Sequence, residues 1–128
     1  MNSVEGFISS VMLEVEKKVK QNEFYDALDI LSNLMTKNNK ILFFRAKIYF
    51  SISDFYNSLK DCEECINLSL NDNSTLIEVY QLSVINYIKM FDLENAKEKL
   101  NICFNLEKNN QKNKELFSLI FSVARQNL

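Results

Sequence analysis

The residues best suited to chemistry in this chain are its cysteines, two of which form a CxxC motif at Cys62 and Cys65. Such a motif can be redox-active or can supply half of a zinc site. Cys103 is the only other thiol and the chain has no histidine, so a tetrahedral metal site would need a carboxylate ligand. When the repeated segments of the chain are aligned, Cys62 and Cys65 fall on core positions. We therefore predict structural thiols, whereas a redox or metal protein would need both side chains to be exposed.

Paired carboxylates are the other candidates for chemistry, at Glu63 and Glu64 and at Asp92 and Glu94. Adjacent acidic residues on a helix usually face water, so they do not indicate an acid–base pair. The absence of histidine removes Ser-His-Asp and Cys-His catalysis, and a single glycine excludes a glycine-rich phosphate loop. We expect no catalytic, cofactor or metal site, and no enzyme.

The composition favours helices as the elements that position these side chains. The chain has 128 residues, of which 47% are hydrophobic, with one Gly and no Pro. β-hairpins, sandwiches and barrels need those turn residues, so an all-α fold is predicted.

The charge and the cysteine content limit which partners and which cellular compartment are plausible for this chain. The net charge of −2 lacks the basic excess of a nucleic-acid-binding surface, and no run of apolar residues is long enough to cross a membrane. An odd number of cysteines, without a recognisable signal peptide, favours a cytoplasmic protein.

Apolar residues recur at three- and four-residue spacing along most of the chain, which predicts about seven helices with short connections in one domain. Consecutive helices joined by such short loops pack antiparallel to each other. One predicted helix start is Thr75–Glu78, which has the S/T-x-x-E form of a capping box.

Three segments of the chain align with each other as repeats. They are EFYDALDILSNLM, DFYNSLKDCEECI and DLENAKEKLNICF. Each begins with an acidic residue and an apolar one, and each has a small residue at the same offset: Ala27, Ser58 and Ala96. The intervals of 58 − 27 = 31 and 96 − 58 = 38 average close to the ~34-residue period of a helix–turn–helix solenoid.

This pattern resembles tetratricopeptide-repeat (TPR) proteins over nearly the whole chain. The middle repeat matches best, with Ala46, Tyr49, Ser58 and Cys65 at the family's large and small core positions. The first repeat departs from the pattern because Lys18 stands where the others have tyrosine. The family's usual proline is absent throughout.

The resemblance implies a right-handed α-solenoid of three TPR-like helical hairpins and a C-terminal capping helix. We expect a single domain over residues 1–128, with repeats at 8–38, 39–73 and 74–110 and a terminal helix at 112–127.

In TPR proteins the first helix of each pair lines a concave groove that holds a partner peptide or helix. The resemblance places on this surface Met12, Glu16, Phe43, Lys47, Phe50, Glu78, Gln81, Ile85 and Ile88. Phe43, Phe50 and Ile85 have an alternative interpretation, in which they pack only against neighbouring helices.

TPR adaptors that bind acidic chaperone tails use a two-carboxylate clamp of Lys, Asn and Arg. The corresponding residues here are Met12, Glu16, Phe44, Glu78 and Leu82. None of them can donate a charge-assisted hydrogen bond to a carboxylate, so we predict no clamp-type binding.

The apolar residues of the last helix cover roughly 200° of its surface, about twice the usual minimum. This width predicts an exposed patch around Phe117 and Phe121 for a partner or a second copy of the chain. The alternative is that the helix is wedged into the last repeat and partly covered by a loop.

Together these features predict a non-enzymatic adaptor or scaffold, and the TPR resemblance implies a co-chaperone or complex-assembly role. The alternative function is a small constitutive subunit of a larger complex, docked through its apolar C-terminal helix.

Overall fold

The computed structural model describes residues 3–34 and 38–126, and the chain divides into two compact units, Met1–Lys37 and Asn38–Leu128. Over the described residues the chain forms seven α-helices and no strand. The all-α prediction and the number of helices are therefore confirmed.

The first unit is a helical hairpin of α1 (Ser3–Lys20) and α2 (Phe24–Ser32). Val15 of α1 and Ala27 of α2 are fully buried, and Leu31 of α2 is 1% exposed. The small side chain of Ala27 fits the prediction that a small residue lies in the core of each repeat.

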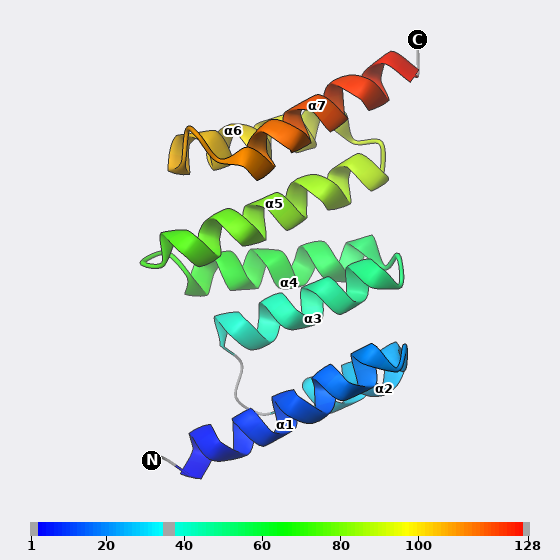
Figure 1. Ribbon diagram of the computed structural model, residues 1–128, viewed down its shortest axis with the longest axis vertical. Helices are drawn as coiled ribbons and strands as arrows, with labels where there is room; N and C mark the ends of the chain where they lie inside the picture. Colours follow the sequence, from blue (N-terminus) through cyan, green and yellow to red (C-terminus); the bar gives the residue numbers. More distant parts are fainter. Residues whose placement is uncertain (1–2, 35–37, 127–128) are drawn as a thin grey trace. The chain divides into compact units, whose positions relative to one another are not determined.

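The second unit contains α3 (Asn39–Ser51), α4 (Phe55–Leu68), α5 (Asn73–Lys89), α6 (Leu93–Leu106) and α7 (Gln111–Gln126). Figure 1 shows these helices running alternately in opposite directions, so that α3, α5 and α7 are parallel to one another. α3 pairs with α4 and α5 with α6, while α4 also packs on α5 and α7 packs on both α5 and α6.

Aspartates cap three of the helices of the second unit, α4, α5 and α6. Asp54 and Asp92 each accept a hydrogen bond from the backbone N–H three residues later, which satisfies a free donor of the first turn of α4 and of α6. Asp72 does the same for α5 through Thr75 N–H. The predicted capping box with Thr75 as the cap is therefore wrong, because Asp72 is a stronger cap and starts α5 at Asn73.

The turns between paired helices share a left-handed residue. Among the described residues the positive φ angles are those of Asn22, Ser53 and Phe91, at 59–63°, and each immediately precedes the residue that caps the next helix. In this conformation the N–H of the next residue returns to the carbonyl oxygen of a residue five positions earlier, as in Asp54 N–H to Tyr49 O at 2.9 Å. The three turns therefore have equivalent geometry without a glycine.

Small side chains lie where the paired helices cross. Ala46 and Ser58 are fully buried, and the Ser58 hydroxyl donates to the Ala46 carbonyl at 2.8 Å. Cys62 and Cys65 belong to the same cluster, with Val79 from α5. The predicted packing of this repeat is thus confirmed, since only small residues let α3 and α4 approach this closely.

Buried polar groups also join the helices of the second unit. Arg45 of α3 donates two hydrogen bonds of 2.7 Å to the carboxylate of Asp61 in α4. Asn86 of α5 donates to Ser58 Oγ at 3.0 Å, which extends the Ser58–Ala46 link to a third helix. These bonds fix how α3, α4 and α5 are aligned.

None of the described helices is both long enough and apolar enough to cross a membrane.

Candidate functional site

The second unit has a shallow hollow at the surface where α3, α5 and α7 meet, with a volume of about 220 Å³. Five of the residues predicted for the groove lie in its lining: Phe43, Lys47, Glu78, Gln81 and Ile85. Leu82 and Lys112 complete it. The parallel helices α3, α5 and α7 therefore bring these predicted residues together.

The centre of the hollow is apolar and its edges are charged. Phe43 and Ile85 are half-buried, whereas Lys47, Glu78 and Lys112 are exposed. The Lys47 ammonium lies 4.5 Å from the centre of the Phe43 ring, a cation–π contact that covers part of the aromatic face. A partner side chain placed here would meet apolar surface between two cations and one carboxylate.

Gln81 lies in this hollow but its amide nitrogen already has partners. It donates to Oδ1 of Asn110 at 3.0 Å and to Oδ1 of Asn113 at 2.8 Å, and the residue is only 7% exposed. Asn113 also donates to the Glu107 carbonyl at 3.1 Å. Gln81 therefore anchors the end of the α6–α7 loop and the first turn of α7, where Lys112 lies at the edge of the hollow.

Two predicted groove residues lie elsewhere. Ile88 is 5% exposed and packs in the cluster of α5, α6 and α7 with Leu100 and Cys103. Phe50 is half-buried against Phe55, with ring centres 5.8 Å apart, beside the cluster of α3, α4 and α5. For Phe50 the alternative interpretation, packing against neighbouring helices, describes the structure better. Ile88 was predicted only for the groove, and that prediction fails because its side chain is buried in the core of α5, α6 and α7.

The remaining predicted groove residues, Met12 and Glu16, belong to α1 in the first unit. Met12 is half-buried and Glu16 is exposed.

Three of the positions aligned with a carboxylate clamp are in the second unit. Phe44 is half-buried with the Lys47 ammonium 5.5 Å from its ring centre, Leu82 is 8% exposed, and Glu78 is exposed. None of these side chains is a hydrogen-bond donor.

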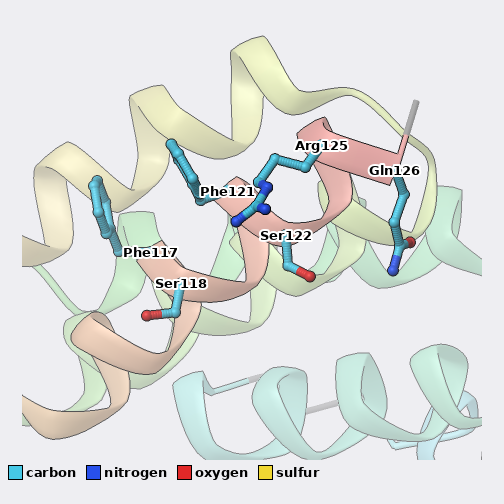
Figure 2. A pocket seen from close by; sticks show the side chains of 6 residues that line it. All are labelled: Phe117, Ser118, Phe121, Ser122, Arg125 and Gln126. Carbon is cyan, nitrogen blue, oxygen red and sulfur yellow. The ribbon is translucent and has the colours of Figure 1, made fainter. Parts of the chain in front are cut away.

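The end helix presents a second candidate surface. Phe117 and Phe121 are each 59% exposed, while Leu116 and Ile120, on the adjacent side of α7, are buried. Figure 2 shows the two rings projecting side by side from α7, with Ser118 and Ser122 on another side of the helix. The aromatic residues predicted for partner binding are thus exposed.

The cysteines are poor nucleophiles because all three are buried. Burial raises the pKa of Cys62 from 9.0 to about 12, and that of Cys103 to the same value. It also raises the pKa of Cys65, whose thiol donates to the Asn39 carbonyl at 3.1 Å. The prediction of structural thiols agrees with this burial, and the described residues contain no cluster of three potential metal ligands.

Lys112 is a lining residue that the sequence analysis missed. The repeat period could have identified it. If α7 is treated as the first helix of a further repeat, Lys112 aligns with Glu78, which lies 112 − 78 = 34 residues earlier.

No protein-family model matches the chain, and no curated protein matches it. Solved structures do match. The first TPR domain of Spaghetti (RPAP3), bound to the HSP90 peptide SRMEEVD, is 23% identical with a TM-score of 0.73, over 90% of this chain and 91% of that one. The first TPR domain of human RPAP3 is 22% identical with a TM-score of 0.75, over 91% of each chain.

The TPR2B domain of yeast Sti1, in complex with pHsp70, is 15% identical with a TM-score of 0.75, over 92% of this chain and 96% of that one. These likenesses cover almost the full length of each chain. The paired antiparallel helices, the small residues at their crossings and these neighbours lead to one conclusion: this chain has the fold of a TPR domain.

Proposed function

We propose that this chain is a non-enzymatic protein–protein interaction adaptor that holds a peptide or helix of its partner in the groove formed by α3, α5 and α7. The observation that supports this most is the hollow itself, in which half-buried Phe43 and Ile85 lie between the charged side chains of Lys47, Glu78 and Lys112. Peptide grooves commonly combine an apolar centre with a polar rim.

The solved neighbours support the same proposal, because TPR domains of RPAP3 and Sti1 are seen with HSP90 or HSP70 peptides. A co-chaperone or complex-assembly role in the cytoplasm follows by analogy of fold. The groove residues carried into this proposal are Phe43, Lys47, Glu78 and Ile85 of the second unit. Met12 and Glu16 belong to the first unit and stay predictions from the sequence.

A selection from displayed random peptides tests the groove directly. The wild-type chain is expected to select peptides with an apolar side chain for Phe43 and Ile85, and a synthetic copy should shift amide resonances of α3 and α5. If the selected peptide has a basic group that pairs with Glu78, Glu78→Lys should lower its affinity for the chain by about tenfold or more. If the peptide has an acidic group that pairs with Lys47, Lys47→Glu should lower the affinity by a similar factor.

Lys60→Glu is the matched control for Lys47→Glu, because Lys60 is an exposed lysine on α4 and is not in the hollow. Equal binding by wild type and both groove variants, with resonance shifts confined to other helices, would contradict the proposal.

Clamp-type binding of acidic chaperone tails is not part of this proposal. Phe44, Glu78 and Leu82 offer no donor to a terminal carboxylate, and the charge of Glu78 repels one. Calorimetry with the peptide SRMEEVD is therefore expected to show no micromolar complex. A micromolar complex that Glu78→Lys tightens only slightly would mean that other residues form a clamp.

The second candidate function is a constitutive subunit docked through α7, favoured by the exposure of Phe117 and Phe121. An obligate subunit should aggregate without its partner, and Phe121→Asp should relieve the aggregation. A free adaptor should sediment as a single species with or without this substitution.

A further inference from the structure

The packing of α7 repeats that of α5. Three buried residues on one side of α5 are spaced three and then four positions apart, and three buried residues of α7 have the same spacing. Each of the α7 residues comes 34 positions after its counterpart in α5 (113 − 79, 116 − 82 and 120 − 86). The pairs are Val79 and Asn113, Leu82 and Leu116, and Asn86 and Ile120. α7 therefore occupies the place of the first helix of a fourth hairpin.

The opposite side of α5 shows what this position normally packs against. Val84 and Ile88 lie on that side and pack into the cluster with Ala96 and Leu100 of α6, the second helix of the hairpin. The residues 34 positions later are Ser118 and Ser122, and both are exposed. In the described part of the chain, α7 thus presents to solvent the face that in α5 carries a paired helix.

The shape of this face suits a helix. One hollow of about 530 Å³ is lined by Phe117, Ser118, Phe121, Ser122, Arg125 and Gln126, which Figure 2 shows together along α7. The small serines leave room for an approaching backbone, and the two exposed rings offer apolar surface beside them.

A second hollow of about 370 Å³ lies between α6 and α7. It shares Phe117 and Phe121 with the first and adds Leu100 and Phe104 to its apolar lining. The two aromatic rings therefore stand between two adjoining hollows, and one helix laid along α7 would contact both.

The charges of this face select among occupants. Arg125 is the charged residue of the first hollow and Lys97 that of the second, and no carboxylate lines either one. A symmetric contact with a second copy would add two more cations without an acidic partner. A helix with acidic side chains beside an apolar stripe is complementary to the face.

We propose that the face formed by α6 and α7 is a second docking site, separate from the groove, which takes an acidic amphipathic helix of another protein. The helix occupies the position of the second helix of a fourth hairpin. Its apolar stripe covers Phe117 and Phe121, and its flanking carboxylates pair with Lys97 and Arg125.

Two synthetic amphipathic peptides of about 18 residues test this proposal. Both carry the same leucine stripe at i, i+3, i+4 and i+7, one with glutamate flanks and the other with lysine flanks. At low salt the wild-type chain should bind the glutamate peptide at least about tenfold more tightly than the lysine peptide. The double variant Lys97→Glu/Arg125→Glu should reverse that preference.

Phe121→Asp should reduce binding of the glutamate peptide by about tenfold or more, while Tyr56→Asp, at an aromatic residue of α4 that is 75% exposed, should leave it unchanged. Lys47→Glu should also leave it unchanged, which separates this site from the groove. If Phe121→Asp does not fold, the charge-reversal variant alone decides, because Lys97 and Arg125 are exposed.

Three results would overturn the proposal. They are equal affinity for the two peptides, a preference that the charge-reversal variant does not change, and a wild-type dimer in sedimentation that Phe121→Asp dissociates. The last result would make a second copy the occupant.

Discussion

At the scale of single residues, Arg45 and Asp61 form an ion pair whose side chains are mostly buried. Asp61 is 3% exposed at its side chain and Arg45 is 13% exposed, and each carboxylate oxygen accepts one hydrogen bond from the guanidinium. The same hydrogen bond raises the pKa of Arg45, so the guanidinium stays protonated. Such a pair contributes mainly by defining one alignment of α3 on α4.

Asp61→Asn is expected to lower the free energy of unfolding by about 3 kcal/mol, because Arg45 is left partly buried without its counter-ion. Urea denaturation measures this loss. Glu23→Gln is the control, since it breaks the exposed Lys18–Glu23 pair and should cause no measurable change. A loss no larger than that of the control would mean that the Arg45–Asp61 pair is as solvated as a surface pair.

The buried thiols predict how stability depends on pH. Cys62 and Cys103 have a pKa of about 12 in the folded chain, against 9.0 when they are exposed by unfolding. Between these values the unfolded chain has lost protons that the folded chain retains. Stability should therefore fall as the pH rises from 9 towards 12, by up to about 1.4 kcal/mol per pH unit for each thiol.

Denaturation at several pH values checks this slope. In Cys62→Ala the slope should be shallower by the contribution of one thiol, whatever the variant loses in packing. Parallel curves for the wild type and the variant would show that Cys62 does not titrate in this way. Thiol reagents at pH 8 should react rapidly only after unfolding, because the thiolate is the reactive form.

At the scale of elements, the helical hairpins depend on their left-handed turn residues. Asparagine adopts this conformation readily, whereas it is strained for a bulky residue such as Phe91. The Phe91 side chain is 70% exposed, so little burial offsets that strain.

Phe91→Gly should raise the free energy of unfolding by about 0.5–1 kcal/mol, because relief of the strain exceeds the added freedom of glycine in the unfolded chain. Asn22→Gly is the matched control and should change stability much less. Equal effects of the two substitutions in thermal denaturation would mean that Phe91 carries no extra strain.

The elements also show what can be read from the sequence. Small residues such as Ser58 and Ala96 predict the helix crossings because their size is what packing requires there. The sequence predicts Thr75 as the cap of α5, whereas the structure has Asp72. Both residue types suit a helix start, and the sequence alone does not distinguish them. Gln81 was expected to face a partner, but its role depends on Asn110 and Asn113, about thirty residues away. Such long-range contacts leave no local pattern.

At the scale of the whole molecule, the two compact units differ in the size of their cores. The first unit buries residues of two helices around Val15 and Leu31, whereas the second builds continuous clusters across five helices. In repeat arrays, stability is approximately the sum of such units and their nearest-neighbour interfaces.

Native-state hydrogen exchange should therefore show amides of α1 and α2 opening at a lower free energy than those of α4 and α5. The difference follows from α4 and α5 having packed neighbours on both sides within the second unit. A single opening free energy for all slowly exchanging amides would mean that the chain unfolds as one cooperative block.

The concealment of all three native thiols has a practical consequence. A cysteine introduced at an exposed position such as Lys17 or Glu98 would be the sole fast target for a maleimide probe at neutral pH. Pairs of such sites, one in each unit, would accept fluorophores or spin labels without removal of any native cysteine. Dipolar or energy-transfer spectroscopy could then measure the distance between the two labels with and without an added peptide.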